Sequence, residues 1–65
     1  MIQVKPIENE MWQVTSNGRW WTVARIRTFT MVGWHIMNET GRTISADGQL
    51  GRKLIAAVQA KLEEV

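Results

Sequence analysis

The chain has 65 residues, no cysteine, one histidine and a formal net charge of +2. This length fits a single small domain over residues 1–65, and the composition excludes disulfides and cysteine-based metal sites. One histidine does not build a metal site alone, and no apolar run approaches the about 20 residues that span a bilayer. The opening residues alternate in polarity instead of forming a signal core, so we expect a soluble, cytoplasmic protein without a cofactor.

A short first strand is predicted near the start of the chain. Ile2 and Val4 alternate with two polar residues, which is typical of a strand with one covered face. Pro6 has no N–H to donate, so the strand either ends there or lies at a sheet edge. Residues 7–10 are then the connection to the next strand.

The clearest local signal is a β-hairpin with strands near 11–16 and 19–27. Its turn is Asn17-Gly18, the sequence favoured in a type I′ turn because both central residues need positive φ. A two-residue turn sets the register: Ser16 lies opposite Arg19, and the pairing continues residue by residue along both strands to Trp12 opposite Val23. One face then gathers Trp12, Val14, Trp21 and Val23, and the other gathers Met11, Gln13, Thr15, Trp20, Thr22 and Ala24.

The segment 28–33 has no clear pattern, although Phe29, Met31 and Val32 are strand formers and Gly33 fits a bulge or a turn. Residues 34–37 alternate again. A three-residue loop over 39–41, with its glycine in the left-handed region, predicts a second hairpin. In the register of this hairpin, Ile36 lies opposite Ile44 and Met37 lies opposite Thr43.

A helix is predicted after this hairpin, with either Ser45 or Asp47 as its N-terminal cap. Gly48 and Gly51 weaken its first turn, so either the helix starts late or another segment approaches closely there. Apolar residues recur at three- and four-residue steps and define one stripe, which also includes a lysine: Leu50, Leu54, Ala57, Val58, Lys61, Leu62 and Val65.

The predicted fold class is α+β: an antiparallel β-meander of four to five short strands with one C-terminal α-helix packed on one sheet face. The helix is expected to cover Trp12, Val14, Trp21, Val23, Trp34, Ile36 and Ile44. The opposite face is expected to remain uncovered, with Met11, Gln13, Thr15, Trp20, Thr22, Ala24, Ile26, His35, Met37 and Thr43.

The first functional hypothesis is a small module that binds nucleic acid, DNA rather than RNA, through this uncovered face. Trp20 would stack on bases while arginines contact phosphates. In the predicted register Arg25 and Arg27 point toward the helix side. Either a bulge or a strong twist turns them outward, or they snorkel past the helix end or pair with Glu10. The candidate binding residues are Arg19, Trp20, Arg25, Arg27, His35, Met37 and Arg42.

The alternative hypothesis is a protein-binding regulator or inhibitor of the kind found in phages and plasmids, or a homodimer, using the same face. Its anchors would be Met11, Trp20, Ile26 and Met37, because tryptophan is a frequent hot-spot residue and methionine adapts to irregular surfaces. Enzymatic activity is not expected, since His35 has no visible nucleophile or paired carboxylates around it.

Two segments also resemble a known family. The hairpin residues 17–21, Asn-Gly-Arg-Trp-Trp, and the helical LGRKLIAAVQAKLE are similar in layout to the arm-type DNA-binding domains of phage integrases. Members of that family place a three-stranded sheet in the major groove and support it with one helix. The resemblance covers about half of the chain and implies DNA binding through the sheet.

Overall fold

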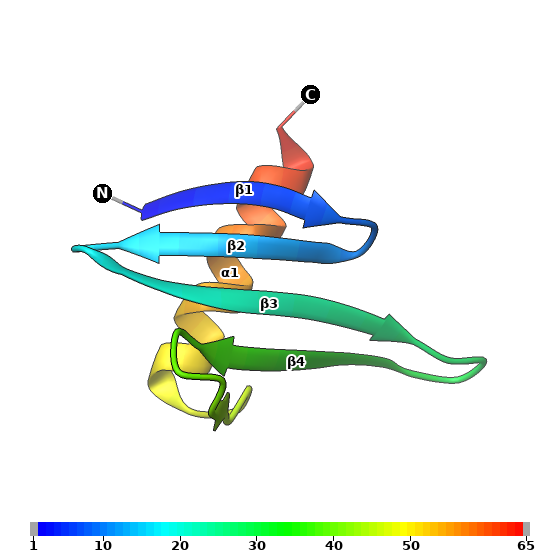
Figure 1. The fold of residues 1–65 in the computed structure, drawn as a ribbon. Helices are drawn as coiled ribbons and strands as arrows, with labels where there is room; N and C mark the ends of the chain where they lie inside the picture. The colour runs from blue at the N-terminus through cyan, green and yellow to red at the C-terminus, as the bar shows by residue number, and fades with distance from the viewer. Residues whose placement is uncertain (1, 65) are drawn as a thin grey trace.

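The computed structural model describes residues 2–64 as one antiparallel sheet with a single helix across it (Figure 1). The strands follow one another in the sheet in the order β1-β2-β3-β4-β5, which confirms the predicted α+β meander. The elements are β1 (Ile2–Glu8), β2 (Met11–Ser16), β3 (Arg19–Arg27), β4 (Val32–Asn38), β5 (Thr43–Ile44) and α1 (Gln49–Glu63).

The two turns that the sequence specified most clearly have the predicted geometry. Asn17 and Gly18 have φ values of 54° and 78°, as a type I′ turn requires. The β2–β3 register runs from Ser16 opposite Arg19 to Met11 opposite Ala24, as predicted. A correct register matters here because a one-residue slip would exchange the two faces of the sheet.

The β4–β5 hairpin also has the predicted register, with Ile36 opposite Ile44 and Met37 opposite Thr43. Gly41 has a φ of 86°, which explains why a glycine is needed in this loop. The side-chain oxygen of Asn38 accepts hydrogen bonds from the backbone N–H groups of residues 40 and 42, at 3.0 and 2.9 Å. These bonds organise the loop from within.

The first strand is longer than predicted. β1 continues through Pro6 to Glu8, so residues 7 and 8 are not part of the connection. Pro6 is accommodated because β1 is an edge strand, and the register shifts between Pro6 and Glu8. The chain turns at Asn9-Glu10, where Glu10 adopts a positive φ of 61°.

The β3–β4 connection is a short turn that the sequence did not predict. The N–H of Thr28 donates to the carbonyl oxygen of Met31 at 2.9 Å, and the Thr28 hydroxyl accepts from the Met31 N–H at 3.1 Å. β4 therefore begins at Val32. Gly33 is a regular strand residue opposite Ile26, neither a turn nor a bulge.

The start of α1 differs from the predicted caps. The N-cap residue is Gly48 without a side-chain cap, whereas the Ser45 hydroxyl accepts a bond from the Asp47 N–H at 3.2 Å. Both explanations offered for Gly48 and Gly51 are observed. The helix starts late, at Gln49, and the preceding segment of the chain approaches Gly51 closely. A Cβ at Gly51 would lie 2.1 Å from the Ser45 carbonyl oxygen.

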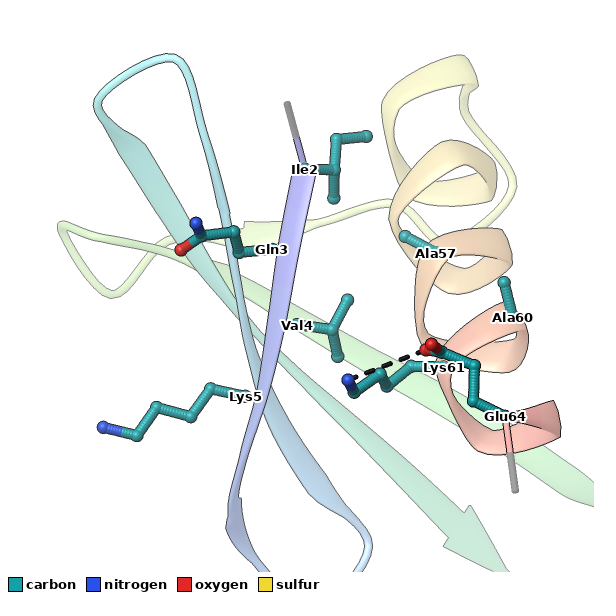
Figure 2. Close-up of a pocket in the computed structure, with 8 residues that line it drawn as sticks. All are labelled: Ile2, Gln3, Val4, Lys5, Ala57, Ala60, Lys61 and Glu64. Carbon is teal, nitrogen blue, oxygen red and sulfur yellow. Dashed lines mark ion pairs between the residues drawn. The ribbon is translucent and has the colours of Figure 1, made fainter.

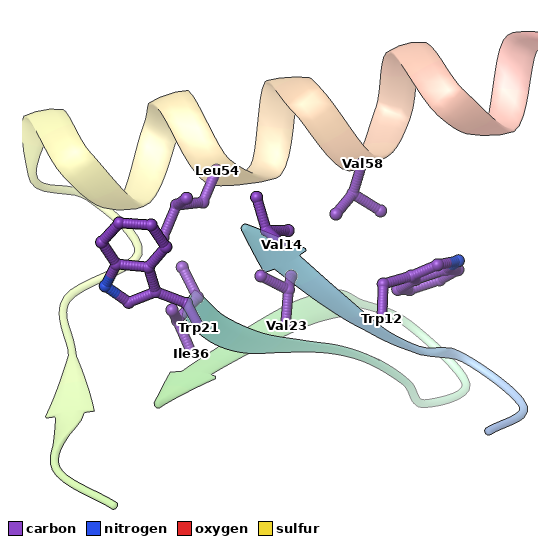
Figure 3. Packing of buried hydrophobic residues seen from close by; sticks show 7 residues of the cluster. All are labelled: Trp12, Val14, Trp21, Val23, Ile36, Leu54 and Val58. Carbon is purple, nitrogen blue, oxygen red and sulfur yellow. The ribbon is translucent and has the colours of Figure 1, made fainter. Parts of the chain in front are cut away.

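The core lies between the sheet and α1 (Figure 3), and its buried members are Trp12, Val14, Trp21, Val23, Ile36, Leu54 and Val58. Trp34 and Ile44 pack against this cluster and are partly buried, so the expected covered face is confirmed. The expected helix stripe is wrong at its ends, since Leu50 and Leu62 are exposed. Val65 lies outside the described residues.

Candidate functional site

The sheet face opposite α1 is called the open face below. Its members follow from strand alternation and from register, because residues opposite one another point to the same side. They are Gln3, Lys5, Glu8, Met11, Gln13, Thr15, Trp20, Thr22, Ala24, Ile26, Gly33, His35, Met37 and Thr43. Figure 1 shows α1 behind the sheet, so no helix within residues 2–64 covers this face.

Trp20 and Trp21 are consecutive residues with opposite environments. Trp21 is 5% exposed under α1, whereas Trp20 is 38% exposed on the open face opposite Thr15. Met11 and Met37 are half-buried on the same face, and Ile26 is exposed. The open face therefore presents an indole and flexible apolar side chains to solvent, as the sequence predicted.

Little charge lies on the open face. Its two residues that are charged at neutral pH, Lys5 and Glu8, are both in the edge strand β1. The polar groups that the middle strands contribute are mainly the hydroxyls of Thr15 and Thr22 and the amide of Gln13. His35 is exposed there, and its Nε2 lies 3.4 Å from the Thr43 hydroxyl. Within residues 2–64, no three metal-ligating side chains come together.

Three of the four predicted arginines lie on the helix side of β3 and not beside Trp20. The first is Arg19, which alternates with Trp20 and shares the face of Trp21. Its guanidinium lies 5.4 Å from the centre of the Trp21 ring, and its Nε is 3.3 Å from a carboxylate oxygen of Glu39. Arg19 therefore covers the edge of the core.

Arg25 and Arg27 meet Glu10 on the same side. Arg25 makes two hydrogen bonds to the Glu10 carboxylate, at 2.5 and 3.0 Å, and the Arg27 Nε lies 3.5 Å from it. Hydrogen bonding from Arg25 lowers the pKa of Glu10 below its ordinary value and raises the pKa of Arg25. Pairing with Glu10 was one of the predicted alternatives and is the one observed; the described β3 has no register shift that would turn these arginines outward.

The Arg25 guanidinium also lies beside two neighbouring indoles. It is 5.5 Å from the ring centre of Trp12 and 5.9 Å from that of Trp34, and the two rings are themselves 6.3 Å apart. A cation held by a carboxylate and by two aromatic faces is fixed in place. Arg25 therefore stabilises the far end of the core and does not present its charge to the open face.

The seven predicted site residues thus separate into three places. Trp20, His35 and Met37 lie together on the open face, and the three β3 arginines lie on the opposite side. Arg42 is exposed in the turn before β5, where its backbone N–H is bound by the Asn38 side chain. The structure therefore does not place the β3 arginines around Trp20.

A second exposed region lies at the end of the β3–β4 hairpin. Phe29 is fully exposed at 108%, and Met31 and Val32 are 70% and 55% exposed. The sequence identified these residues as strand formers but not as surface. The sequence signal that could have drawn attention to this region is that residues 28 to 35 include no Asp, Glu, Lys or Arg.

Two hollows lie between the sheet and the helix. The larger, about 600 Å³, separates β1 from the last turns of α1, with an ion pair of 3.6 Å between Lys61 and Glu64 at its side (Figure 2). The smaller, about 250 Å³, is lined by Arg19, Lys53 and Trp21 among others. The Trp21 indole N–H has no partner in the described structure, but this nitrogen is fully buried and does not reach water in that hollow.

No family model, no curated protein and no solved structure matches this chain. Within the described residues, no helix has the length and apolar character needed to cross a membrane.

Proposed function

We propose that this protein is a non-enzymatic binding module that docks on a protein partner through its open face. The observation that supports this most strongly is an exposed Trp20 on the open face, to which the middle strands β2 to β4 contribute no Asp, Glu, Lys or Arg. Centres of protein interfaces are depleted of charged residues, and tryptophan is enriched among their hot spots. Regulation or inhibition of that partner is the role we propose for the contact.

Charge placement favours a protein partner over a nucleic acid. Affinity for nucleic acid comes largely from lysine and arginine contacts to phosphates. On β3, however, Arg19 is paired with Glu39, and Arg25 and Arg27 are paired with Glu10, all on the helix side. Lys5 is the one lysine or arginine among the described open-face residues.

Nucleic-acid binding remains a second candidate because of a different observation. Strands β2 to β5 contribute no carboxylate to the open face, and their threonine, glutamine and histidine side chains can both donate and accept hydrogen bonds. The sequence pI is about 9.7. Such a face would read base edges with only a small phosphate footprint, so its affinity would be weak.

The proposal is tested with Trp20→Ala and a matched control, Leu62→Ala, which removes an apolar side chain of similar exposure from the end of α1. Lysate of the source cells is treated with nuclease and passed over each immobilised protein. A partner retained by wild type is identified, purified and titrated by calorimetry. Trp20→Ala should weaken its binding by about 2 kcal/mol or more, whereas Leu62→Ala should not.

Equal affinity of wild type and Trp20→Ala for the purified partner would contradict the proposal. The second candidate is tested by titrating duplex and single-stranded DNA at two salt concentrations. Binding that falls steeply with salt and depends on Trp20 would favour a nucleic acid. Absent or salt-independent binding would remove that candidate.

A further inference from the structure

The outer edge of β4 is only partly paired. β5 pairs with two residues of β4, Ile36 and Met37, so the part of β4 before Ile36 has no neighbouring strand on its outer side. The backbone N–H of Arg25 points toward β2, since it donates to Glu10, and that of Asn38 points away from β3, since it donates to Arg42.

Because antiparallel strands alternate the direction of their hydrogen-bonding groups, these two bonds fix the direction for every residue of β4. The even-numbered residues of β4 point outward. Val32 and Trp34 therefore direct one N–H and one C=O each toward the open edge, and no backbone bond beyond the sheet ladders involves them in the described chain.

The segment that forms this edge is mostly apolar and uncharged, and the nearest charges are Arg25 and Arg27 on the neighbouring strand β3. It belongs to the hairpin that extends beyond α1 and beyond the β1–β2 hairpin in Figure 1. Phe29, Met31 and Val32 are exposed there, and no residue from 28 to 35 is an acid, a lysine or an arginine. Open backbone groups and exposed apolar side chains thus coincide at one place, which is the usual signature of a strand that pairs with another chain.

The opposite edge of the sheet differs in this respect. β1 contains Lys5, Pro6 and a register shift before Glu8, which are the features that commonly prevent edge-to-edge pairing. β4 has no proline, no lysine and no register shift. If one edge of this sheet associates with a second strand, it is β4.

We propose that two copies of this chain pair antiparallel through β4, about a two-fold axis at Gly33. Val32 then lies opposite the partner's Trp34, and Trp34 lies opposite the partner's Val32. In this register each open N–H meets an open C=O, so every free backbone group of these two residues is paired. The two Gly33 residues face each other, where the lack of side chains lets the backbones approach.

Side chains and charge agree with this register. Val32 and the partner's Trp34 share the helix side and form a cross-strand apolar pair, which would cover a valine that is now 55% exposed. No like charges meet, because the paired segments contain none. Both open faces point the same way and both Trp20 side chains stay free, so this inference is independent of the proposed function.

The test is sedimentation velocity from micromolar to millimolar concentration on wild type, Val32→Lys and a matched control, Ile7→Lys. Both positions are exposed, but Ile7 lies in β1 on the other edge. Wild type and Ile7→Lys should form the same concentration-dependent dimer, whereas Val32→Lys should raise its dissociation constant by about tenfold or more.

A second variant, Val32→Pro, removes the outward N–H without removing a bond to β3, and it should also raise the dissociation constant of the dimer. Far-ultraviolet circular dichroism and tryptophan emission report whether each variant is folded. The inference is overturned by a wild-type monomer at millimolar concentration, by dissociation in Ile7→Lys but not in Val32→Lys, or by a dimer that Trp20→Ala dissociates.

Discussion

The close approach of the β5–α1 connection to the helix predicts a large effect for Gly51→Ala. The added Cβ would lie 2.1 Å from the Ser45 carbonyl oxygen and 2.9 Å from the Ala46 Cα. An ordinary carbon–oxygen contact is roughly 3.3 Å, so the connection would have to move by about 1 Å. Overpacking of this kind costs about 3 kcal/mol.

Helix propensity acts in the opposite direction, because alanine in a helix interior is favoured over glycine by about 1 kcal/mol. The net loss in the free energy of unfolding should therefore be about 2 kcal/mol. For a domain of this size that corresponds to a drop in Tm of roughly 10 °C. Urea unfolding followed by tryptophan emission measures the difference directly.

Gly48→Ala is the matched control, three residues earlier. The nearest atom to a Cβ at Gly48 is 3.7 Å away, which is an ordinary contact, and Gly48 has a negative φ of −73°. Its free energy of unfolding should fall by only about 0.5 kcal/mol, because alanine is a weaker N-cap residue than glycine. A Gly51→Ala protein as stable as wild type would refute the reasoning, since helix propensity alone would then decide the outcome.

Four further substitutions test other parts of the structure. Because Arg25 holds the pKa of Glu10 below its ordinary value of 4.5, stability should fall as the pH drops below that value, and Glu10→Gln should flatten this acid limb in pH-dependent unfolding. Trp21→Ala should cost about 3–5 kcal/mol, whereas Trp20→Ala should cost about 1 kcal/mol or less; equal losses would show that both indoles are buried. Gly41→Ala should cost about 1–2 kcal/mol in the same assay, because φ is positive there.

Local turn chemistry made much of this fold predictable. Asn17-Gly18 and Gly41 each specified a turn, and each turn set the register of the strands beside it. Once the register is known, alternation assigns every strand residue to a face. This is why the separation of Trp20 from Trp21 followed from the sequence.

Features that depend on tertiary contacts were less predictable. The helix begins at Gln49, and the backbone of Ser45 approaches Gly51 closely there, a contact that no local preference encodes. The extension of β1 past Pro6 depends on its position at the sheet edge. The alternation that assigned Trp20 to the open face also places Arg19 on the opposite face. The carboxylate with which each arginine pairs, however, cannot be predicted from the sequence alone.

The central claim is that the open face leaves Trp20 in contact with solvent while α1 buries Trp12 and Trp21. Fluorine NMR of protein labelled with 5-fluorotryptophan tests it directly, since the chain has 4 tryptophans and conservative Trp→Phe variants assign each signal. The Trp20 signal should shift clearly between H₂O and D₂O, and the Trp12 and Trp21 signals should not. A Trp20 signal as insensitive to solvent as that of Trp21 would contradict the account.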